Sequence, residues 1–430
     1  MHFRSLTWSV LLTAACASGG MPASEEELTA RARAIHERVI TMDTHDDIPG
    51  TFGTAGYNAC NELSRQVDIP KMRRGGLDVA FFIVFVGQGD RTAEGNERAK
   101  QAALTKFTGI HALAEQQCPD QIQIAYTPDE VERIARTGKL VTVIGIENGY
   151  VIGRDLSLIK RYYDLGGRYL TLAHTTHNDI SDSSNPPQPE HNGISDFGEQ
   201  VVAEMNRVGM MVDVSHISKA AMLEAIKVSK APVIGSHSST RAFADVARNM
   251  DDEQLRALKA NGGVVQIVAL DNYVKVMPLE RQTAINALRT EFGIPTGRGG
   301  RGGGGRAGGG GGRGGNPLDS LSAERRTEYN RRLAEIESRY PSANVQDFVN
   351  HIDHAVKLIG VDHVGISSDF DGGGGIQGWN NAAETFNVTL ELVRRGYTEE
   401  QIAKLWGGNL LRVWREVDRV ARRLQNATDR

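Results

Sequence analysis

Short apolar runs rich in β-branched residues recur along the chain and alternate with longer segments of mixed character. The runs are nearly continuous in apolar residues, which is typical of strands buried on both faces of a parallel sheet. Eight of them occur, at residues 39–44, 79–86, 140–146, 169–173, 210–215, 232–236, 262–269 and 363–368. We interpret these runs as the strands of one parallel sheet.

The segments between the runs carry helical signals, and several end in glycine, as helix C-termini often do. Examples are residues 157–166, 197–209, 218–229 and 251–262. Eight strands alternating with helices predict an α/β fold, a (β/α)8 barrel of the TIM type, over about residues 28–425. An open, doubly wound sheet is the alternative, but no glycine-rich phosphate loop follows any of the runs.

One segment interrupts the alternation. Residues 297–315 read GRGGRGGGGRAGGGGGRGG, a composition that cannot bury enough apolar surface to become ordered. They lie in the connection from the seventh predicted strand to the eighth, about 275–345, and we interpret them as a flexible surface insertion. The helical segment 323–340 that follows is expected to pack on the barrel or cover its edge.

An RGG-type nucleic-acid segment is the alternative interpretation of this insertion. The formal net charge of the chain is −4 and its sequence pI is about 6.3. A near-neutral balance gives no general electrostatic reason to bind nucleic acid or an anionic membrane, so we expect no nucleic-acid partner.

The N-terminus has the pattern of an export signal. A basic start, MHFR, precedes the apolar run SLTWSVLLTAACA, which is too short to span a bilayer as a mature helix. We predict that residues 1–17 are a signal peptide and that the mature protein is periplasmic or extracellular. LTAAC also resembles a lipoprotein cleavage box, so a lipid anchor at Cys16 is the one membrane attachment we consider.

Export implies an oxidising compartment, which bears on the three cysteines. If Cys16 is removed or lipidated, Cys60 and Cys118 remain. They form either a disulfide or two free buried thiols, and the sequence leaves both alternatives open.

Histidines and carboxylates stand where the predicted strands end, at the face that carries the catalytic groups of (β/α)8 barrels. The strand-end sequences are THDD, GIENG, LAHTTHND, DVSH, GSH and SSDFDGG. The candidate residues in them are His45, Asp47, Glu147, His174, His216, His237 and Asp369. Converging imidazoles and carboxylates are costly to hold together without a cation, and Zn²⁺ accepts both ligand types. The pattern therefore predicts a metal site.

The spacing indicates how the ligands divide. His45 and Asp47 lie two apart, so on an extended chain both can reach one cation. His216 and His237 end adjacent strands and can hold a second ion, and Glu147 has two oxygens with which to bridge the pair. Two metals about 3.5–4 Å apart are the usual template for activating a bridging water as hydroxide, which suits hydrolysis of an amide or ester.

Other polar residues near these strand ends receive no catalytic role. Asp46 should point away from its neighbours on the first strand, so we interpret it as a structural or solvated carboxylate. Asp371, Asn178 and His177 also lie near the predicted site.

In order and spacing, the chain resembles the membrane dipeptidase (renal dipeptidase) family of zinc metallopeptidases over residues 28–425, apart from the insertion. The matching sequences are DTHDDIP, VDIPKMRRGGLDVAFF, GIENG, GGRYLTLAH, FGEQVVAEMNRVGMMVDVSH, PVIGSHSSTRA, ARNMDDEQL, GVDHVGISSDFDG and GGNLLRV. The resemblance implies a (β/α)8 barrel with two Zn²⁺ per chain, and it implies a homodimer. The implied activity is hydrolysis of dipeptides with a free C-terminal carboxylate. The resemblance also implies tolerance of a D-residue at the C-terminal position.

Carried over residue by residue, the resemblance implies that His45 and Asp47 bind the first zinc. His216 and His237 would bind the second, and Glu147 would bridge both.

The resemblance also implies roles for three further residues and raises one doubt. His174 resembles the histidine that polarises the scissile carbonyl and steadies the oxyanion, and Arg248 resembles the arginine that binds the substrate's C-terminal carboxylate. Asp369 resembles the acid that passes a proton to the leaving amine and binds the substrate's α-amino group. Leu270 stands where the family often has an aromatic residue, which leaves the side-chain preference open.

Two alternatives to a dipeptidase are considered. A related metal-dependent amidohydrolase or lactonase would act on N-acyl amino acids or small esters, and turnover of substrates without a free carboxylate would identify it. A non-catalytic scaffold with RGG-mediated contacts would have no need of about two zinc ions per chain.

Overall fold

The computed structural model describes residues 24–294, 318 and 321–428. The predicted signal peptide with Cys16 and the glycine-rich segment 297–315 lie outside the described residues. Within this part of the chain, every helix is too short or too polar to cross a lipid bilayer.

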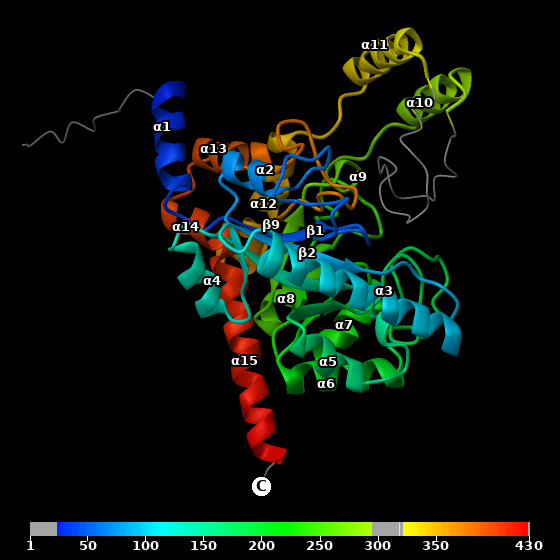
Figure 1. Ribbon diagram of the computed structural model, residues 1–430, viewed down its shortest axis with the longest axis vertical. Coiled ribbons are helices and arrows are strands. Elements are labelled where there is room, and N and C mark those ends of the chain that lie inside the picture. Colours follow the sequence, from blue (N-terminus) through cyan, green and yellow to red (C-terminus); the bar gives the residue numbers. More distant parts are fainter. Residues whose placement is uncertain (1–23, 295–317, 319–320, 429–430) are drawn as a thin grey trace, which may run out of the picture.

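The described strands form one parallel sheet (Figure 1). They are β1 (Met42–Asp47), β2 (Val79–Phe85), β3 (Ile122–Ile124), β4 (Leu140–Glu147), β5 (Gly167–Thr171), β6 (Met211–Asp213), β7 (Ile234–Gly235), β8 (Val264–Val268) and β9 (Val364–Ser367). The strand order is β1-β2-β4-β5-β6-β7-β8-β9, and β3 pairs with the start of β4.

The sheet closes on itself between β9 and β1. The backbone N–H of Asp47 donates to the carbonyl of Phe370 at 2.8 Å, and Asp46 forms a parallel bridge with the same residue. This closure confirms the (β/α)8 barrel, and each of the eight predicted runs contains or overlaps one strand of the ring. The extra strand β3 was not predicted, because three residues are too few to produce a recognisable run.

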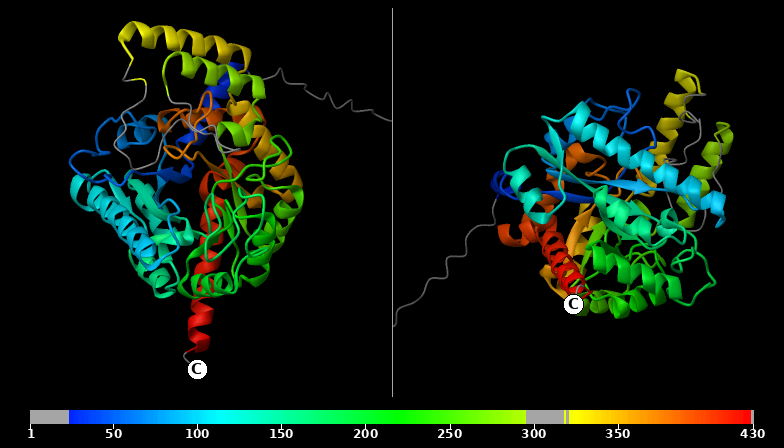
Figure 2. Two further views of the ribbon diagram at one scale, coloured as in Figure 1. Left: turned by 90° about the vertical axis from the view of Figure 1, so that its right-hand side faces the viewer. Right: turned by 60° about the horizontal axis from the view of Figure 1, so that its bottom comes forward.

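The α-helices alternate with the strands and surround the barrel (Figure 2). They are α1 (Glu25–His36), α2 (Ile69–Gly75), α3 (Ala93–Ala112), α4 (Pro128–Ala135), α5 (Ser157–Asp164), α6 (Asp196–Val208), α7 (Lys219–Val228), α8 (Asp252–Asn261), α9 (Asp271–Val274), α10 (Leu279–Glu291), α11 (Ala323–Arg339), α12 (Val345–Ile359), α13 (Phe386–Arg394), α14 (Glu399–Ala403) and α15 (Asn409–Thr428). The four helices predicted as examples correspond to α5, α6, α7 and α8.

Local sequence explains where these helices begin and end. The side chain of Ser195 accepts a hydrogen bond from the first turn of α6, and Gly209 ends that helix in the left-handed conformation. Asp251 and Gly262 do the same for α8. Each helix therefore returns the chain sharply to the start of the next strand.

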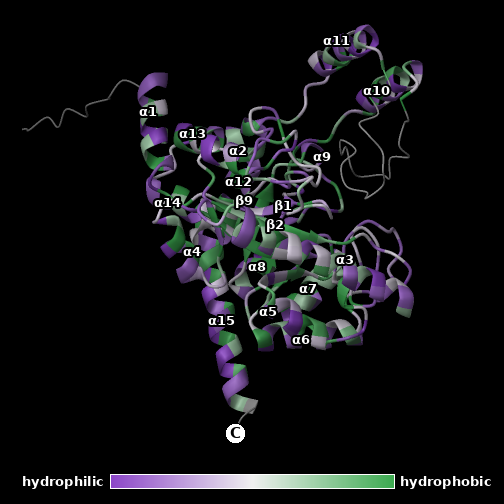
Figure 3. Cartoon of the chain, viewed as in Figure 1, coloured by the Kyte–Doolittle hydropathy of each residue, from purple (hydrophilic) through white to green (hydrophobic). Residues whose placement is uncertain are grey.

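The barrel interior is apolar at the amino-terminal ends of the strands, and α15 closes it there. Side chains from the starts of the strands, such as Met42, Val141 and Val264, form one buried cluster with Leu410 and Trp414 of α15. In Figure 3, α15 alternates between apolar and polar residues along its length. The C-terminal helix therefore closes the amino-terminal end of the barrel and leaves the opposite end for the site.

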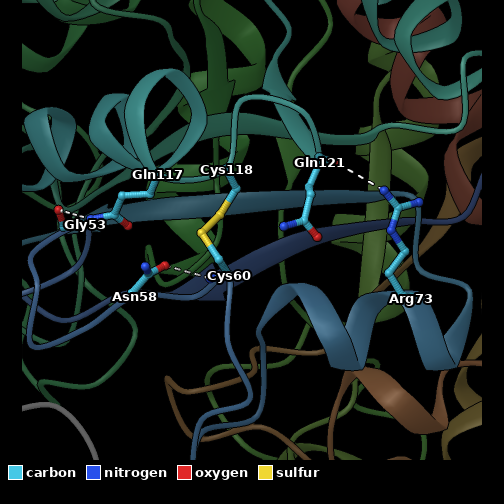
Figure 4. The surroundings of a disulfide bond; sticks show 7 residues. All are labelled: Gly53, Asn58, Cys60, Arg73, Gln117, Cys118 and Gln121. Carbon is cyan, nitrogen blue, oxygen red and sulfur yellow. Dashed lines mark hydrogen bonds between the residues drawn. A yellow bond between two sulfur atoms is a disulfide. The ribbon is translucent and has the colours of Figure 1, made fainter.

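A disulfide joins Cys60, in the connection between β1 and α2, to Cys118, just after α3 (Figure 4). Their Cα atoms are 6.0 Å apart. The side-chain amide of Gln117 also donates to the carbonyl of Gly53 at 2.6 Å. Of the two alternatives that the sequence left open, the structure has the disulfide, which ties the β1–α2 connection to the end of α3.

Helices α10 and α11 lie side by side and project from the barrel (Figures 1 and 2). They share a small core of their own that includes Leu288, Phe292 and Tyr329. Tyr329 is the one buried residue of α11, and Arg332 of α11 pairs with Glu291 of α10 at 2.5 Å. The segment 323–340 was expected to pack on the barrel or cover its edge; in the structure its buried side chain, Tyr329, packs in the small core that it shares with α10.

Candidate metal centre

The predicted site residues lie at the carboxyl ends of their strands. His45 and Asp47 belong to β1 and Glu147 is the last residue of β4, whereas the others follow their strands within three residues. His174 follows β5, His216 follows β6, His237 follows β7 and Asp369 follows β9.

The structure brings all seven of these side chains together. Their potential ligand atoms form three overlapping groups, each with all atoms within 4.8 Å of one another. The groups are His45–Glu147–His237, Glu147–His174–His216 and His45–Asp47–Asp369. Because the groups share His45 and Glu147, they form one continuous cluster.

Glu147 lies at the centre of this cluster. Its Oε1 is 3.0 Å from Nε2 of His216 and 3.3 Å from Nε2 of His237, and its Oε2 is 3.6 Å from Nε2 of His45. Burial alone would raise the pKa of Glu147, but the neighbouring His174 and His45 bring that pKa well below its usual value. The carboxylate is therefore ionised between histidines that come from opposite sides of the barrel.

Two histidine nitrogens converge beside it. Nε2 of His216 and Nε2 of His237 are 2.8 Å apart. Burial brings the pKa of both imidazoles well below the usual value, so both are neutral. Neutral imidazoles whose nitrogens point to one place are suited to a metal ion.

A tyrosine determines which nitrogen of His45 is free. The hydroxyl of Tyr169 donates to the carbonyl of Thr44 at 3.0 Å, so it accepts a hydrogen bond from Nδ1 of His45 at 2.9 Å. In the neutral ring, Nε2 then carries the lone pair and faces Glu147. An outer hydrogen bond of this kind orients a metal-ligating histidine.

His237 is held in the same way. The hydroxyl of Ser236 donates to a carboxylate oxygen of Asp213 at 2.7 Å and accepts from Nδ1 of His237 at 2.8 Å. Its Nε2 is therefore the free nitrogen. Two histidines thus present Nε2 lone pairs to the cluster through independent supports.

The side chains fit a bound cation. Nε2 of His45 and Oε1 of Glu147 are buried without a hydrogen-bond partner. Burial alone lowers the pKa of His45, yet Glu147, Asp47 and Asp369 raise it to about 9. The cluster therefore favours positive charge at its centre, and its imidazole nitrogens and carboxylate oxygens are ligands that Zn²⁺ accepts.

Arg248 lies beside the cluster in the connection from β7 to β8 and is only 6% exposed. Its guanidinium donates to the hydroxyl of Ser238 at 2.6 Å and to the carbonyl of His237 at 2.5 Å. It also lies 5.5 Å from the centre of the Tyr273 ring, and its Nε has no hydrogen-bond partner. The guanidinium is therefore held rigidly, with one buried donor unpaired.

The backbone at two site residues is in the left-handed region. His216 has φ 67° and Asp369 has φ 60°. A residue with a side chain is rare there and costs about 1–3 kcal/mol, so the surrounding structure must impose the conformation.

Burial also raises the pKa of Asp369 well above its usual value, so this carboxyl retains a proton readily.

The family model of the membrane dipeptidases (peptidase family M19) matches residues 29–428. The chain belongs to the membrane dipeptidase family. It is therefore a hydrolase of the metallo-dipeptidase class, and the cluster of seven side chains, called the metal cluster below, could hold the metal of such an enzyme.

Relatives and solved structures agree with this membership. The chain is 30% identical over 378 residues to "Dipeptidase aclJ" of Aspergillus oryzae, an alignment that covers 86% of this chain and 74% of the relative. The probable dipeptidase PvdM from Pseudomonas aeruginosa is 33% identical with a TM-score of 0.77, covering 92% of this chain and 100% of PvdM.

A more distant structure shares the fold. A metallo peptidase from Rhodobacter sphaeroides, liganded with a phosphinate mimic of the dipeptide L-Ala-D-Ala, is 20% identical with a TM-score of 0.66. The match covers 88% of this chain and 99% of that one.

Asp46 was interpreted as a structural or solvated carboxylate, and the structure has the first of these alternatives. It is completely buried, and neither of its side-chain oxygens has a hydrogen-bond partner. Burial and the neighbouring Asp43 raise its pKa well above the usual value, so the carboxyl is neutral. In this membrane dipeptidase, Asp46 is a buried structural residue behind the metal cluster.

The remaining polar residues near the dipeptidase site brace its loops. Asp371 accepts hydrogen bonds from the backbone of Gln66 at 3.1 Å and Val67 at 3.4 Å, so it joins the β9 loop to the β1–α2 connection. Asn178 accepts from two backbone N–H groups of its own loop, and His177 accepts one from Ser183 at 2.9 Å.

Sequence reasoning missed the residues that support the ligands. Tyr169 contacts His45, Ser236 contacts His237 and is held in turn by Asp213, and Tyr273 contacts Arg248. Tyr169 lies in an apolar strand, where an aromatic residue is ordinarily part of the core. Only the pairing of distant strands shows that its hydroxyl reaches a ligand.

Proposed function

We propose that the chain is a zinc-dependent dipeptidase that hydrolyses dipeptides with a free C-terminal carboxylate and accepts a D-residue at that end. One observation carries the proposal. Five metal-ligand side chains from the ends of four strands converge beside a buried arginine, and two of their ligand atoms lack any hydrogen-bond partner. Acceptance of D-residues rests on family membership alone.

In this proposal His45 and Asp47 hold one zinc ion, His216 and His237 hold the other, and Glu147 contacts both. When bound, the pair of ions supplies an activated water and polarises the scissile carbonyl. The distances from Glu147 to the three histidines support this division. Burial of the ligands excludes bulk water, which strengthens every electrostatic interaction in the site.

Arg248 binds the substrate's C-terminal carboxylate in this proposal. Two of its nitrogens are held by Ser238 and His237, which supports a guanidinium that is oriented before substrate arrives. Pairing of a rigid guanidinium with a carboxylate gives both affinity and geometry. A dipeptide held in this way has its single peptide bond at a fixed distance from the arginine.

His174 and Asp369 act on the peptide bond itself. The His174 side chain is 20% exposed, more than those of the other histidines of the cluster, which suits a group that faces substrate. It donates a hydrogen bond to the oxygen that gains negative charge. Asp369 retains a proton readily because it is buried, and it passes this proton to the leaving amine.

We also propose that the protein is exported. The disulfide between Cys60 and Cys118 supports this, because disulfides persist in oxidising compartments such as the periplasm.

The test is activity and metal content measured together. Purified protein is assayed on L-Ala-L-Ala, L-Ala-D-Ala and N-acetyl-L-alanine, before and after chelation and with zinc added back, and its metal is quantified by mass spectrometry. We expect about two zinc ions per chain, turnover of both dipeptides, and loss and recovery of activity with zinc. Equal or faster turnover of N-acetyl-L-alanine would instead favour an amidohydrolase of N-acyl amino acids.

A further inference from the structure

A lysine stands near the metal cluster, beside an aromatic ring that contacts His174. Lys106 extends from α3, and its ammonium lies 5.7 Å from the centre of the Phe85 ring. Phe85 is the last residue of β2, and its ring centre is 4.7 Å from that of His174. A single aromatic ring therefore connects the ammonium to the histidine proposed to act on the scissile carbonyl.

Among the residues that the structure describes, Lys106 forms no hydrogen bond or ion pair, whereas Lys100 on the same helix pairs with Glu97. Burial lowers the pKa of Lys106, and Asp47 and Glu147 raise it in part. Both of those carboxylates belong to the metal cluster, so neither is free to neutralise the lysine when the ligands are engaged.

A second cation near Lys106 is already paired. The guanidinium Nε of Arg65 lies 3.5 Å from a carboxylate oxygen of Asp371, and its charge lowers the pKa of Lys106. Among the described residues near the end of β2, the charge of Arg65 is therefore paired and that of Lys106 is not. Such an arrangement favours an anionic group brought by substrate.

The position of Lys106 in the ring relates it to one end of the substrate. Around the barrel the order is β1-β2-β4-β5-β6-β7-β8-β9, so β2 lies four strands from β7 in either direction. Arg248 follows β7, and Lys106 lies over the end of β2. The two cations therefore stand on opposite sides of the mouth, with the metal ligands between them.

A dipeptide bound by its C-terminal carboxylate to Arg248 extends across this mouth. Its peptide bond then lies near His174 and its α-amino group near Asp369, which leaves the N-terminal side chain on the side of β2. We propose that Lys106 recognises an acidic side chain on the N-terminal residue of the dipeptide, with the Phe85 ring packing on its methylene groups. This inference rests on the proposed dipeptidase function and deepens it by naming a preferred substrate class.

The test compares two dipeptides that differ only in charge, L-Glu-L-Ala and L-Gln-L-Ala. We expect the wild-type protein to show a kcat/KM at least about 10-fold higher for Glu-Ala, the effect of one charge-assisted hydrogen bond. In K106M, which keeps an apolar stem against Phe85, this ratio should fall to about one. K106R should restore a ratio well above one, because it restores the charge.

K100M is the matched control, since Lys100 lies on the same helix and pairs with Glu97. It should keep the wild-type ratio. Metal content and melting temperature are measured for every variant, and K106Q replaces K106M if the latter does not fold. A wild-type ratio near one, or a ratio that survives the loss of the charge in a folded variant, would overturn the proposal.

Hydrolysis of L-Ala-L-Ala by the wild-type protein distinguishes failure of the proposed dipeptidase function from failure of the proposed role of Lys106. If Ala-Ala is not hydrolysed with zinc present, the proposed function itself has failed. If Ala-Ala is hydrolysed and Glu-Ala is not preferred over Gln-Ala, only the role of Lys106 is wrong.

Discussion

The two ends of the barrel interior are built by the same strands and differ in every chemical respect. β1 contributes Met42 to the apolar end and His45 to the metal cluster, and β4 contributes Val141 and Glu147 in the same way. At the apolar end, Trp414 of α15 fills the interior, whereas at the mouth ionisable side chains face one another. A few residues along a strand separate these two environments.

The comparison teaches how stability and function are divided in this fold. Close packing of apolar side chains at one end stabilises the barrel. At the other end, buried ligand atoms without partners and residues with positive φ cost free energy, and a bound cation would offset the cost of the unpartnered ligand atoms. The stability contributed by the apolar end therefore offsets the unfavourable free energy of the mouth.

The largest expected effect is on the function of the mouth. H216A removes a ligand of the proposed second ion, so we expect about one metal per chain to be lost and kcat/KM for Ala-Ala to fall by about 10³-fold or more. The melting temperature of the metal-free protein should change little. Retention of both metal and activity in H216A would contradict the assignment of His216 as a metal ligand.

The reciprocal change is W414A at the apolar end. Trp414 is fully buried, and removal of such a side chain costs about 3–5 kcal/mol of unfolding free energy. Urea unfolding measures this loss, while the folded fraction should keep its metal content. R423A, at an exposed position on the same helix, is the control and should shift stability by less than about 0.5 kcal/mol.

A smaller effect is expected at the substrate side of the mouth. R248K keeps the charge but loses the forked geometry, so KM for Ala-Ala should rise about 10- to 100-fold with kcat changed less. Steady-state kinetics on Ala-Ala and on its C-terminal amide measure the difference. If KM for the amide rises equally, Arg248 does not recognise the carboxylate.

The smallest effect should appear at the boundary between the two ends. The ring of Tyr169 packs in the apolar cluster while its hydroxyl orients His45, so Y169F should weaken metal affinity about 10- to 100-fold with little loss of stability. A zinc-competition titration measures the affinity. Y162F is the control, because the Tyr162 hydroxyl donates to the carbonyl of Val151 in the outer core; it should leave zinc affinity unchanged.

Much of the fold was predictable because each strand of the ring is a short apolar run ending in polar residues. The same regularity predicts that His45, Glu147, His216 and His237 lie at one face. Their ligand atoms belong to two overlapping groups, each within 4.8 Å, because the ends of barrel strands meet at one face.

Other features could not be decided from the sequence. The disulfide between Cys60 and Cys118 spans 58 residues, and pairing over that separation depends on where α3 packs. Lys106 is one of several polar residues on a surface helix, and its place near Phe85 follows from the packing of α3 against β2. The pairing of α10 with α11 also depends on contacts between segments that are distant in the chain.

The amino-acid sequence by itself determined the barrel, the strand ends that carry the ligands and the family, because periodicity and strand-end residues are local properties of the chain. Tertiary structure alone decided which nitrogen each histidine presents, which end α15 closes and which charged residues reach the mouth. These depend on distances between residues of different strands and helices, and such distances exist only once the ring has closed.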